Sequence, residues 1–438
     1  MRAGRILAII LLLGGLIGVL VGASEIFARF LYLGILVILV SWIWTQFSLR
    51  GVSVKRRTRS LRASVGDTFE EHFELANDSR LGKLWIELSN ESNMPNAHGS
   101  RLMTMVGPRQ KRTHLARTWL YRRGGYKLGP TRLASGDPFG LFRTEKVFPA
   151  AQSLVVLPII YEISSFVSPP GLLPGGQVIR RKALDITPHA AGVREYVPGD
   201  PMKRIHWPTT ARRGQLIVKE FEQDPHAEVW LFLDAQRAVH AEKPSKPLET
   251  SSDGWMFDRR PKFELPPSSL EYAISITASL AHYYLNQPRA VGLVTATPQF
   301  RVIPGEWSER QESKILETLA FIEPEGELSI AGLVAAQAGQ LPQGSSAILI
   351  TPTVHPELAS AVDDLQRRSL RPVVVLLVAD SFGGSKGGEA LYNSLLTRNI
   401  RVCRIYCGAD LSLELSGFSF NLTTQEPTWR RPPLSHLT

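Results

Sequence analysis

Residues 185–222 concentrate side chains that could bind a partner or take part in a reaction. Guanidinium and carboxylate groups are spaced along the segment, at Arg194, Glu195, Asp200, Arg204, Arg212, Glu220 and Glu222. The preferred interpretation is an internally paired polar network that braces a junction between domains. Structural ion-pair networks bring together the same residue types as functional sites do, so the clustering alone does not indicate a function. The alternative is a docking or catalytic site that contains Arg194, Asp200, Arg204 and Arg212.

Turn signals inside this segment predict how those groups are held. Pro198-Gly199 suits a tight turn, in which proline fixes one dihedral angle and glycine accepts a positive one. Asp200 is then placed to cap a short helix that begins at Pro201 and stops at Pro208, before a strand over residues 215–222.

Two aromatic residues follow the predicted turn. His206 is expected to be packed and hydrogen-bonded, and Trp207 is expected to anchor a core. An exposed tryptophan would instead be a good interface hot spot.

Residues 185–222 resemble the hallmark of the bacterial domain-of-unknown-function 58 family, which runs Arg-x-Tyr-x-x-Gly-Asp, Arg-x-Ile-x-Trp, Ala-Arg and a closing Phe-Glu. The matching residues are Arg194, Tyr196, Gly199, Asp200, Arg204, Ile205, Trp207, Ala211, Arg212, Phe221 and Glu222. A preceding family signature is similar to Arg123-Gly-Gly-Tyr-Lys-Leu-Gly-Pro and Asp137-Pro-Phe-Gly-Leu-Phe. The resemblance implies partnership with a MoxR-type AAA+ ATPase, although the biochemistry of the family is largely unassigned.

Two apolar runs near the N-terminus predict a membrane anchor. Residues 6–23 and 30–49 contain no charged side chain, and each approaches the roughly 20 apolar residues needed to cross a bilayer. Their short separation favours a transmembrane helical hairpin over residues 1–49. Lys and Arg residues outside both runs place both ends in the cytoplasm, at the cell inner (cytoplasmic) membrane. A cleaved signal peptide is the alternative, but its apolar core would be unusually long.

The net charge of +10 is concentrated beside this anchor. Residues 50–132 hold 17 Lys and Arg against 7 Asp and Glu, and residues 92–136 hold nine basic residues and no acidic one. A basic stretch at this place could face anionic lipid headgroups. Nucleic acid is a less favoured partner, because no known nucleic-acid-binding module accompanies the charge.

Beyond the anchor, the sequence predicts a multidomain protein. Short alternating runs over residues 50–165 indicate an antiparallel β-sandwich, and residues 166–227 form a linker with the hallmark segment. Residues 228–408 alternate apolar strands with helices, which is typical of a doubly wound α/β domain with a parallel sheet. Residues 409–438 are expected to be a weakly ordered tail.

Ligands of such a sheet bind at the carboxyl ends of its strands, and the first strand ends at Asp234. The region is similar to the von Willebrand factor A fold, which carries Asp-x-Ser-x-Ser there for a divalent cation. Asp234 matches, but Gln236 and Ala238 replace the two serines, so the metal site is expected to be lost. No cofactor is predicted.

Other reactive patterns are weak. Ser385, Asp410 and His436 follow hydrolase order, but Ser385 lies several residues beyond its predicted strand. Cys403 and Cys407 are four positions apart in a predicted strand, too far for a disulfide, and are expected to be core residues.

The sequence therefore favours a membrane-anchored cytoplasmic adaptor or assembly factor that acts through protein–protein contacts and is not an enzyme. Two alternatives remain open. One is an enzyme of cell-envelope metabolism that uses the hallmark Arg and Asp residues, and the other is an anionic-lipid-binding module.

Overall fold

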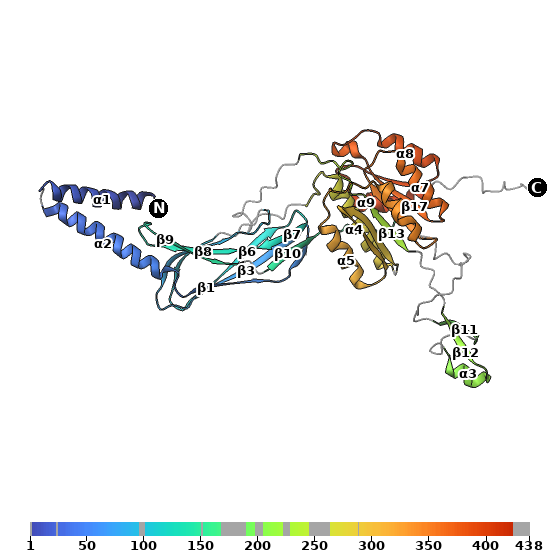
Figure 1. Ribbon diagram of the computed structural model, residues 1–438, viewed down its shortest axis with the longest axis horizontal. Coiled ribbons are helices and arrows are strands. Elements are labelled where there is room, and N and C mark those ends of the chain that lie inside the picture. The colour runs from blue at the N-terminus through green and yellow to red at the C-terminus, as the bar shows by residue number, and fades with distance from the viewer. Residues whose placement is uncertain are drawn as a thin grey trace, which may run out of the picture. The chain divides into compact units, whose positions relative to one another are not determined.

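The computed structural model describes residues 2–22, 25–95, 101–149, 152–167, 190–197, 205–221, 228–244, 263–287 and 289–423. The chain divides into two compact units, one mainly Met1–Ile159 and the other mainly Ile160–Pro244, Leu265–Ile315 and Ile322–Thr438. It is a multidomain α/β protein with apolar helices at the N-terminus and antiparallel sheets after them (Figure 1).

The first unit begins with two apolar helices, α1 (Arg2–Leu20) and α2 (Glu25–Ser48). Among the described residues, α2 is the one helix that is long and apolar enough to cross a membrane, and the apolar part of α1 is shorter. The helices approach closely at Gly15, where an added Cβ would lie 2.7 Å from the backbone nitrogen of Leu31. The transmembrane hairpin itself stays a prediction.

Ten short strands follow in three sheets. They are β1 (Val52–Thr58), β2 (Arg62–Ser64), β3 (Thr68–Asn77), β4 (Lys83–Asn90), β5 (Arg101–Val106), β6 (Lys111–Trp119), β7 (Gly124–Leu128), β8 (Thr131–Gly136), β9 (Arg143–Phe148) and β10 (Gln152–Leu157). The strand orders are β1-β3-β6, β5-β4-β8-β9 and β2-β10-β7, and every pairing is antiparallel except that of β2 with β10. Phe73 and Leu75 of the first sheet share one buried core with Ile86 and Leu88 of the second, so these two sheets form a sandwich.

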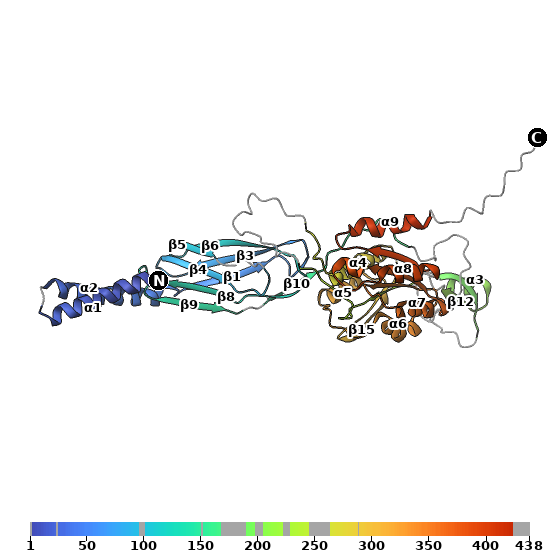
Figure 2. The ribbon, with the colours of Figure 1, turned by 90° about the horizontal axis from the view of Figure 1, so that it is seen from above.

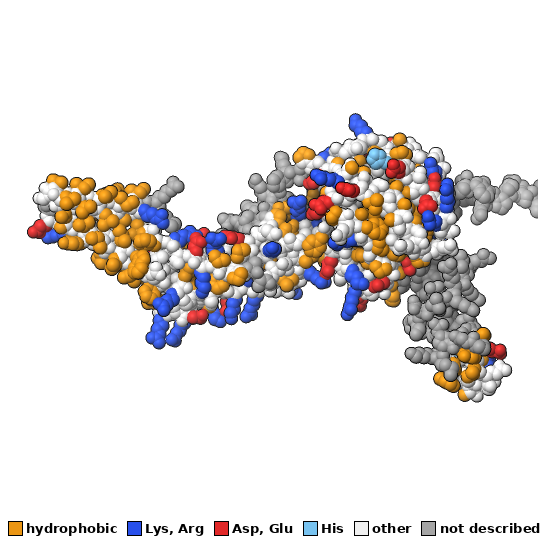
Figure 3. Space-filling model, in the orientation of Figure 1, with side chains coloured by type: hydrophobic (Ala, Val, Ile, Leu, Met, Phe, Trp, Pro, Cys, Tyr) orange, Lys and Arg blue, Asp and Glu red, His pale blue; other side chains and the backbone are white. Residues whose placement is uncertain are grey.

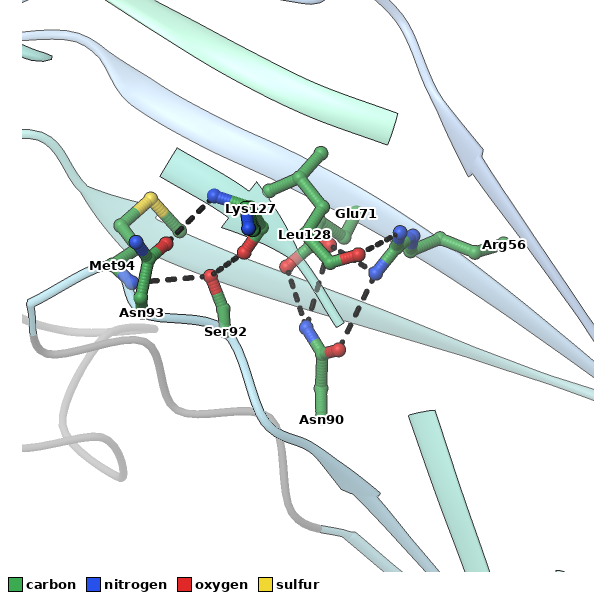
Figure 4. Close-up of polar contacts among 8 residues, drawn as sticks. All are labelled: Arg56, Glu71, Asn90, Ser92, Asn93, Met94, Lys127 and Leu128. Atoms are coloured by element: carbon green, nitrogen blue, oxygen red, sulfur yellow. Dashed lines mark hydrogen bonds and ion pairs between the residues drawn. The ribbon is translucent and has the colours of Figure 1, made fainter. Parts of the chain in front are cut away.

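A buried ion pair links the three sheets (Figure 4). The Arg56 guanidinium on β1 lies 3.7 Å from the Glu71 carboxylate on β3 and donates to the Asn90 side chain on β4 and to the carbonyl of Leu128 on β7. Asn90 in turn donates to Glu71 at 3.3 Å. Burial raises the pKa of Glu71 and lowers that of Arg56, and the attraction between the two charges opposes both shifts.

The second unit contains a six-stranded sheet (Figure 2). Its strands are β13 (Val229–Leu233), β14 (Val291–Thr297), β15 (Gln299–Glu306), β16 (Ser346–Thr351), β17 (Arg371–Leu377) and β18 (Arg401–Ile405), in the order β15-β14-β13-β16-β17-β18. All neighbours are parallel except the edge strand β15. The chain therefore reverses its direction of winding at β13 and β16, as in doubly wound sheets.

Helices connect these strands. They are α4 (Ser269–Asn286), α5 (Glu309–Ala320), α6 (Ile330–Gln337), η2 (Ala338–Gln340), α7 (Glu357–Arg367), η3 (Ala379–Phe382), α8 (Gly388–Thr397) and α9 (Leu411–Thr423). Buried side chains of α6, α7 and α8 share a core with Trp230 and Phe232 of β13. Leu231 and Leu233 point to the other face, where α4 packs against the central strands.

Apart from the short η2 and η3, three elements of the described chain after residue 228 were not predicted from the sequence: β15, α6 and α9. Helix α9 occupies much of the segment expected to be weakly ordered, because Leu411 and Leu415 bury their side chains and Asp410 caps the helix start by accepting from the N–H of Ser412 at 3.0 Å. Residues 424–438 lie outside the described residues.

The two cysteines are free. Cys403 is buried in β18, as expected, and burial raises the pKa of its thiol to about 12. Cys407 lies beyond the end of β18 and is partly exposed, so it is not a core residue.

Candidate functional site

The hallmark segment folds into a small unit of two strands and one helix, which we call the hallmark hairpin. β11 (Ala190–Glu195) pairs antiparallel with β12 (Ile217–Phe221), and Arg194 lies opposite Val218. Ile205 forms an isolated antiparallel bridge to the same Val218. The side chains of Ile205, Ile217 and Val218 are buried, so these described residues contribute to an apolar core of the hairpin.

Helix α3 (Trp207–Arg213) completes the hallmark hairpin. Pro208 lies in its first turn, where the missing N–H is tolerated, so the prediction that Pro208 ends a helix is wrong. The helix ends at Gly214, whose φ of 69° suits glycine and whose N–H donates to the Thr210 carbonyl at 2.9 Å. The Thr210 hydroxyl accepts from the N–H of Ile217 at 3.0 Å, which joins the helix to β12.

The side chains next to α3 differ in burial from the prediction. His206 is partly buried and its Nδ1 lies 2.7 Å from the Thr209 hydroxyl, as expected for a hydrogen-bonded histidine. Trp207 is 63% exposed, so the prediction that it anchors a core is wrong. Val197 and Leu216 are also exposed apolar residues of the hairpin.

The predicted convergence of charges is described only in part. Tyr196 is partly buried and its N–H donates to the Leu216 carbonyl at 2.9 Å. Arg212 is exposed on α3, and no ion pair joins it to another described residue. The backbone of Arg194 lies in β11. Gly199, Asp200, Arg204 and Glu222 lie outside the described residues, so the choice between a paired network and an open site stays a prediction.

A second polar cluster lies at the carboxyl end of the central strand β13. Asp234 is fully buried there, and its Oδ2 accepts from the Thr351 hydroxyl at 2.6 Å. Its Oδ1 accepts from the N–H of Gln236 at 3.0 Å. Thr351 also accepts from the N–H of Thr353 at 3.0 Å, so both carboxylate oxygens and the hydroxyl are engaged within the protein.

His240 closes the same cluster. Its Nε2 lies 2.9 Å from the Asp234 carbonyl oxygen, and its Nδ1 lies 3.0 Å from the Ser269 hydroxyl. With Nε2 as the donor, both ring nitrogens are satisfied in the neutral imidazole. Burial lowers the pKa of His240 to about 4, whereas burial raises the pKa of Asp234 to about 6 against the opposing hydrogen bonds from Thr351 and Gln236.

Sequence reasoning identified Asp234 but missed its partners. Thr351 closes the neighbouring apolar strand, and strand ends on either side of the reversal point meet in space. That placement could have been used to predict the contact. Among the described residues, no group of three or more His, Cys, Asp or Glu could hold a metal ion. Gln236 instead forms a bridge to Gly326.

The serine pattern is not assembled in the described part of the chain. Ser385 is exposed in the loop before α8, whereas Asp410 caps α9. His436 lies outside the described residues.

Comparison with known proteins finds a family that matches part of the hallmark segment. Residues 192–243 match the family described as "Protein of unknown function DUF58". The match runs from β11 to a point just beyond His240. It therefore contains most of the hallmark hairpin and, from the buried cluster, Asp234, Gln236 and His240.

The chain is also similar to the uncharacterized protein YeaD of Bacillus subtilis (strain 168). The two are 26% identical over 232 residues, which cover 52% of this chain and 50% of that protein. The alignment thus spans about half of the relative, whose name states no activity. Both findings support a DUF58 protein and indicate no enzyme family.

Solved structures give weaker likenesses. One is a chain of the complex between Zinc 2-glycoprotein and Prolactin inducible protein from human seminal plasma, with a TM-score of 0.18 and 10% identity over 24% of this chain and 92% of that chain. Another is a CARDB domain from Pyrococcus furiosus, with a TM-score of 0.18 and 12% identity over 24% of this chain and 91% of that chain. At these TM-scores neither carries an argument.

Proposed function

We propose that this protein is a membrane-anchored adaptor or assembly factor that works through protein–protein contacts. The observation that carries the proposal is Trp207, 63% exposed at the start of α3 in the segment that matches DUF58. Tryptophan and arginine are the residue types most enriched among binding hot spots, and α3 ends in the exposed pair Arg212 and Arg213. The partner is a MoxR-type AAA+ ATPase, which the family resemblance implies and which would supply the energy.

The anchor in this proposal is a transmembrane hairpin of α1 and α2, with the rest of the chain in the cytoplasm. Two features support it. Helix α2 is long and apolar enough to span, and the exposed Arg50 and Lys55 follow it directly, as the positive-inside bias requires of a cytoplasmic flank.

The α/β domain in this proposal is a von Willebrand factor A-like module without a metal. Its central strand β13 ends at Asp234, the place of the first aspartate in that fold's cation motif. The support for a lost metal is that Thr351, Gln236 and the burial of Asp234 leave its carboxylate fully engaged within the protein. A surface of strand-end loops is then available for protein contacts.

A binding titration with matched tryptophan variants tests the proposal. The detergent-solubilised full chain is titrated with the purified MoxR-type ATPase of the same organism. Trp207→Ala is expected to weaken binding by about 30-fold, the effect of losing a hot spot of about 2 kcal/mol. Trp307→Ala is the control, because Trp307 is also 63% exposed but lies outside the hallmark hairpin.

Equal affinity of wild type and Trp207→Ala, or no binding at all, overturns this mode of contact. Turnover of a small cell-envelope substrate that is lost in Asp200→Ala and Arg204→Ala would establish the rival, an enzyme built on the hallmark charges.

A further inference from the structure

The end of the sandwich that joins α2 is formed by three loops. Strand register places them: Val52 pairs with Asn77, Ala76 with Lys111, and Lys83 with Val106. Loops 78–82 and 107–110 therefore lie at the end where the chain leaves α2. Loop 137–142 lies there too, because the Leu141 carbonyl accepts from Arg5 Nε of α1 at 3.0 Å.

Direct contacts hold these loops level with the helix ends. The Lys83 ammonium is buried and donates to the Phe47 carbonyl in the last turn of α2 at 2.7 Å, where a cation also complements the helix dipole. An added Cβ at Gly51 would lie 3.1 Å from Ser79, and one at Gly4 would lie 2.0 Å from the Phe139 carbonyl oxygen. Loop 137–142 therefore contacts the start of α1, whereas Lys83 of β4 and Ser79 of loop 78–82 lie against the last turn of α2 and the residues that follow it.

Apolar and basic side chains are exposed together in these loops, and also at Met105 near the end of β5 and at Arg50 just after α2. Leu81 is 59% exposed, Met105 is 70% exposed and Phe139 is 51% exposed. The exposed arginines Arg50, Arg80 and Arg109 lie among them. We call these six residues the helix-proximal rim. In Figure 3, Lys and Arg side chains gather on the sandwich next to the apolar helices.

The three loops contain two acidic residues, Asp78 and Asp137. The Asp137 carboxylate is buried and accepts the N–H groups of Phe139, Leu141 and Phe142. Asp78 is exposed. No ion pair joins Arg50, Arg80 or Arg109 to another described residue.

We infer that the helix-proximal rim docks onto the anionic leaflet of the bilayer that α2 crosses. Leu81, Met105 and Phe139 enter the interfacial region, and the three guanidinium groups contact lipid phosphates. Apolar tips mixed with arginine match that interface, where one layer offers both hydrocarbon and anionic headgroups. The rim lies next to the end of α2, and this favours the bilayer as its binding surface. α2 has 24 residues and thus a length of about 36 Å, so it is long enough to bring its C-terminal end, with the rim beside it, to the membrane interface.

The inference rests on the proposed membrane anchorage, and fluorescence quenching can separate the two. Single cysteines replace Leu81, Met105 or Phe139 in full-length protein that carries Cys403→Ala and Cys407→Ser, and each is labelled with an environment-sensitive dye. The proteins are placed in nanodiscs of phosphatidylcholine, with or without about one third phosphatidylglycerol. Spin-labelled lipid is the quencher. Trp42→Cys on α2 reports anchorage, and Leu61→Cys, beyond the far end of β1, is the matched apolar control.

Labels at positions 81, 105 and 139 are expected to be quenched several-fold more than the label at position 61. The excess is expected to be larger with phosphatidylglycerol and to lose that dependence in the double variant Arg80→Gln, Arg109→Gln. If position 42 is quenched while the rim positions behave like position 61, the docking inference is overturned and the anchor stands. If position 42 is not quenched, the proposed anchorage fails and the inference fails with it.

Discussion

The buried cluster at the end of β13 holds two titratable groups with opposite pH dependence. Burial raises the pKa of Asp234 from its ordinary 3.8 to about 6. The native state therefore keeps a proton there that the unfolded chain loses. The resulting stability is present below about pH 3.8 and is lost as the pH rises through about 6. A difference of about two units between the pKa of Asp234 in the native state and in the unfolded chain corresponds to about 3 kcal/mol in the free energy of unfolding.

His240 acts in the opposite direction. Burial lowers its pKa from the ordinary 6.5 to about 4, so the native state keeps the imidazole neutral where the unfolded chain is protonated. That stability is present above about pH 6.5 and is lost as the pH falls through about 4, again about 3 kcal/mol. Between pH 4 and 6 the two contributions nearly cancel in the wild-type protein.

When one of the two groups is removed, the pH dependence of stability that the other causes is expected to become visible. In Asp234→Asn the opening free energy of β13 should fall by up to about 3 kcal/mol as the pH is lowered from 6.5 to 4. In His240→Gln it should fall by a similar amount as the pH is raised from 4 to 6. Urea titrations at each pH, read by pulsed hydrogen exchange of peptides from β13, measure this quantity without requiring two-state unfolding of the whole chain.

The quantity to compare is the difference in opening free energy between each variant and wild type at each pH, because the contributions of the other titrating groups cancel in this difference. Asp380→Asn is the control, since Asp380 is an exposed carboxylate just beyond the end of β17, and its curve should run parallel to wild type. If Asp234→Asn also runs parallel to wild type between pH 4 and 6.5, the carboxylate is not desolvated and the reasoning is refuted. A slope of opposite sign would refute it equally.

Three further predictions concern the rest of the fold. Glu71→Leu should destabilise the sandwich by about 3 kcal/mol, because it removes the carboxylate that pairs with the largely buried Arg56 guanidinium. Adding Arg56→Met should restore stability to within about 1 kcal/mol, and thermal unfolding of both variants checks this. Gly326→Ala places a Cβ 2.3 Å from a backbone oxygen of β14, so it should cost about 1–3 kcal/mol in the same assay. Iodoacetamide at pH 8 should modify the partly exposed Cys407 and leave Cys403, whose pKa burial raises to about 12, unmodified by mass spectrometry until urea is added.

The parallel strands could be predicted because they are buried on both faces. β13, with Trp230 and Phe232 facing one layer and Leu231 and Leu233 the other, is a continuous apolar run in the sequence. β16 (Ser346–Thr351), in which every side chain is buried, gives the same signal. A strand of this kind can be predicted from its own residues, without information on the helices that pack against it.

The elements that were missed lack this signal. β15 is an edge strand whose side chains are mostly exposed and which contains Pro304 and Gly305, two residues that argue against a strand in sequence. Helix α6 has eight residues, too short for a clear period. Both are held by tertiary contacts, α6 through Ile330, Leu333 and Val334 in the core beside β13.

In the candidate site too, features set by local sequence could be predicted, whereas features set by tertiary contacts could not. Gly214 could be assigned to a turn from its type alone, and it does end α3 at a positive φ. The burial of Trp207 could not be predicted, because it depends on which neighbouring segment covers the side chain. The role of Pro208 was misassigned because proline is compatible with both the stop and the first turn of a helix.

The size of the hallmark hairpin bears on its proposed role. Its described part consists of two short strands and a seven-residue helix, around a core that includes Ile205, Ile217 and Val218. A two-stranded pair of this size is marginally stable in water, and a helix this short gains little from its own hydrogen bonds. An exposed tryptophan adds nothing to such a core, so its apolar area contributes to stability only when another surface covers it. In the proposed function, a hairpin held this weakly would gain order on contact with a partner. The exposure of Trp207 therefore favours recognition of a partner over catalysis, in which the reacting groups must be fixed beforehand.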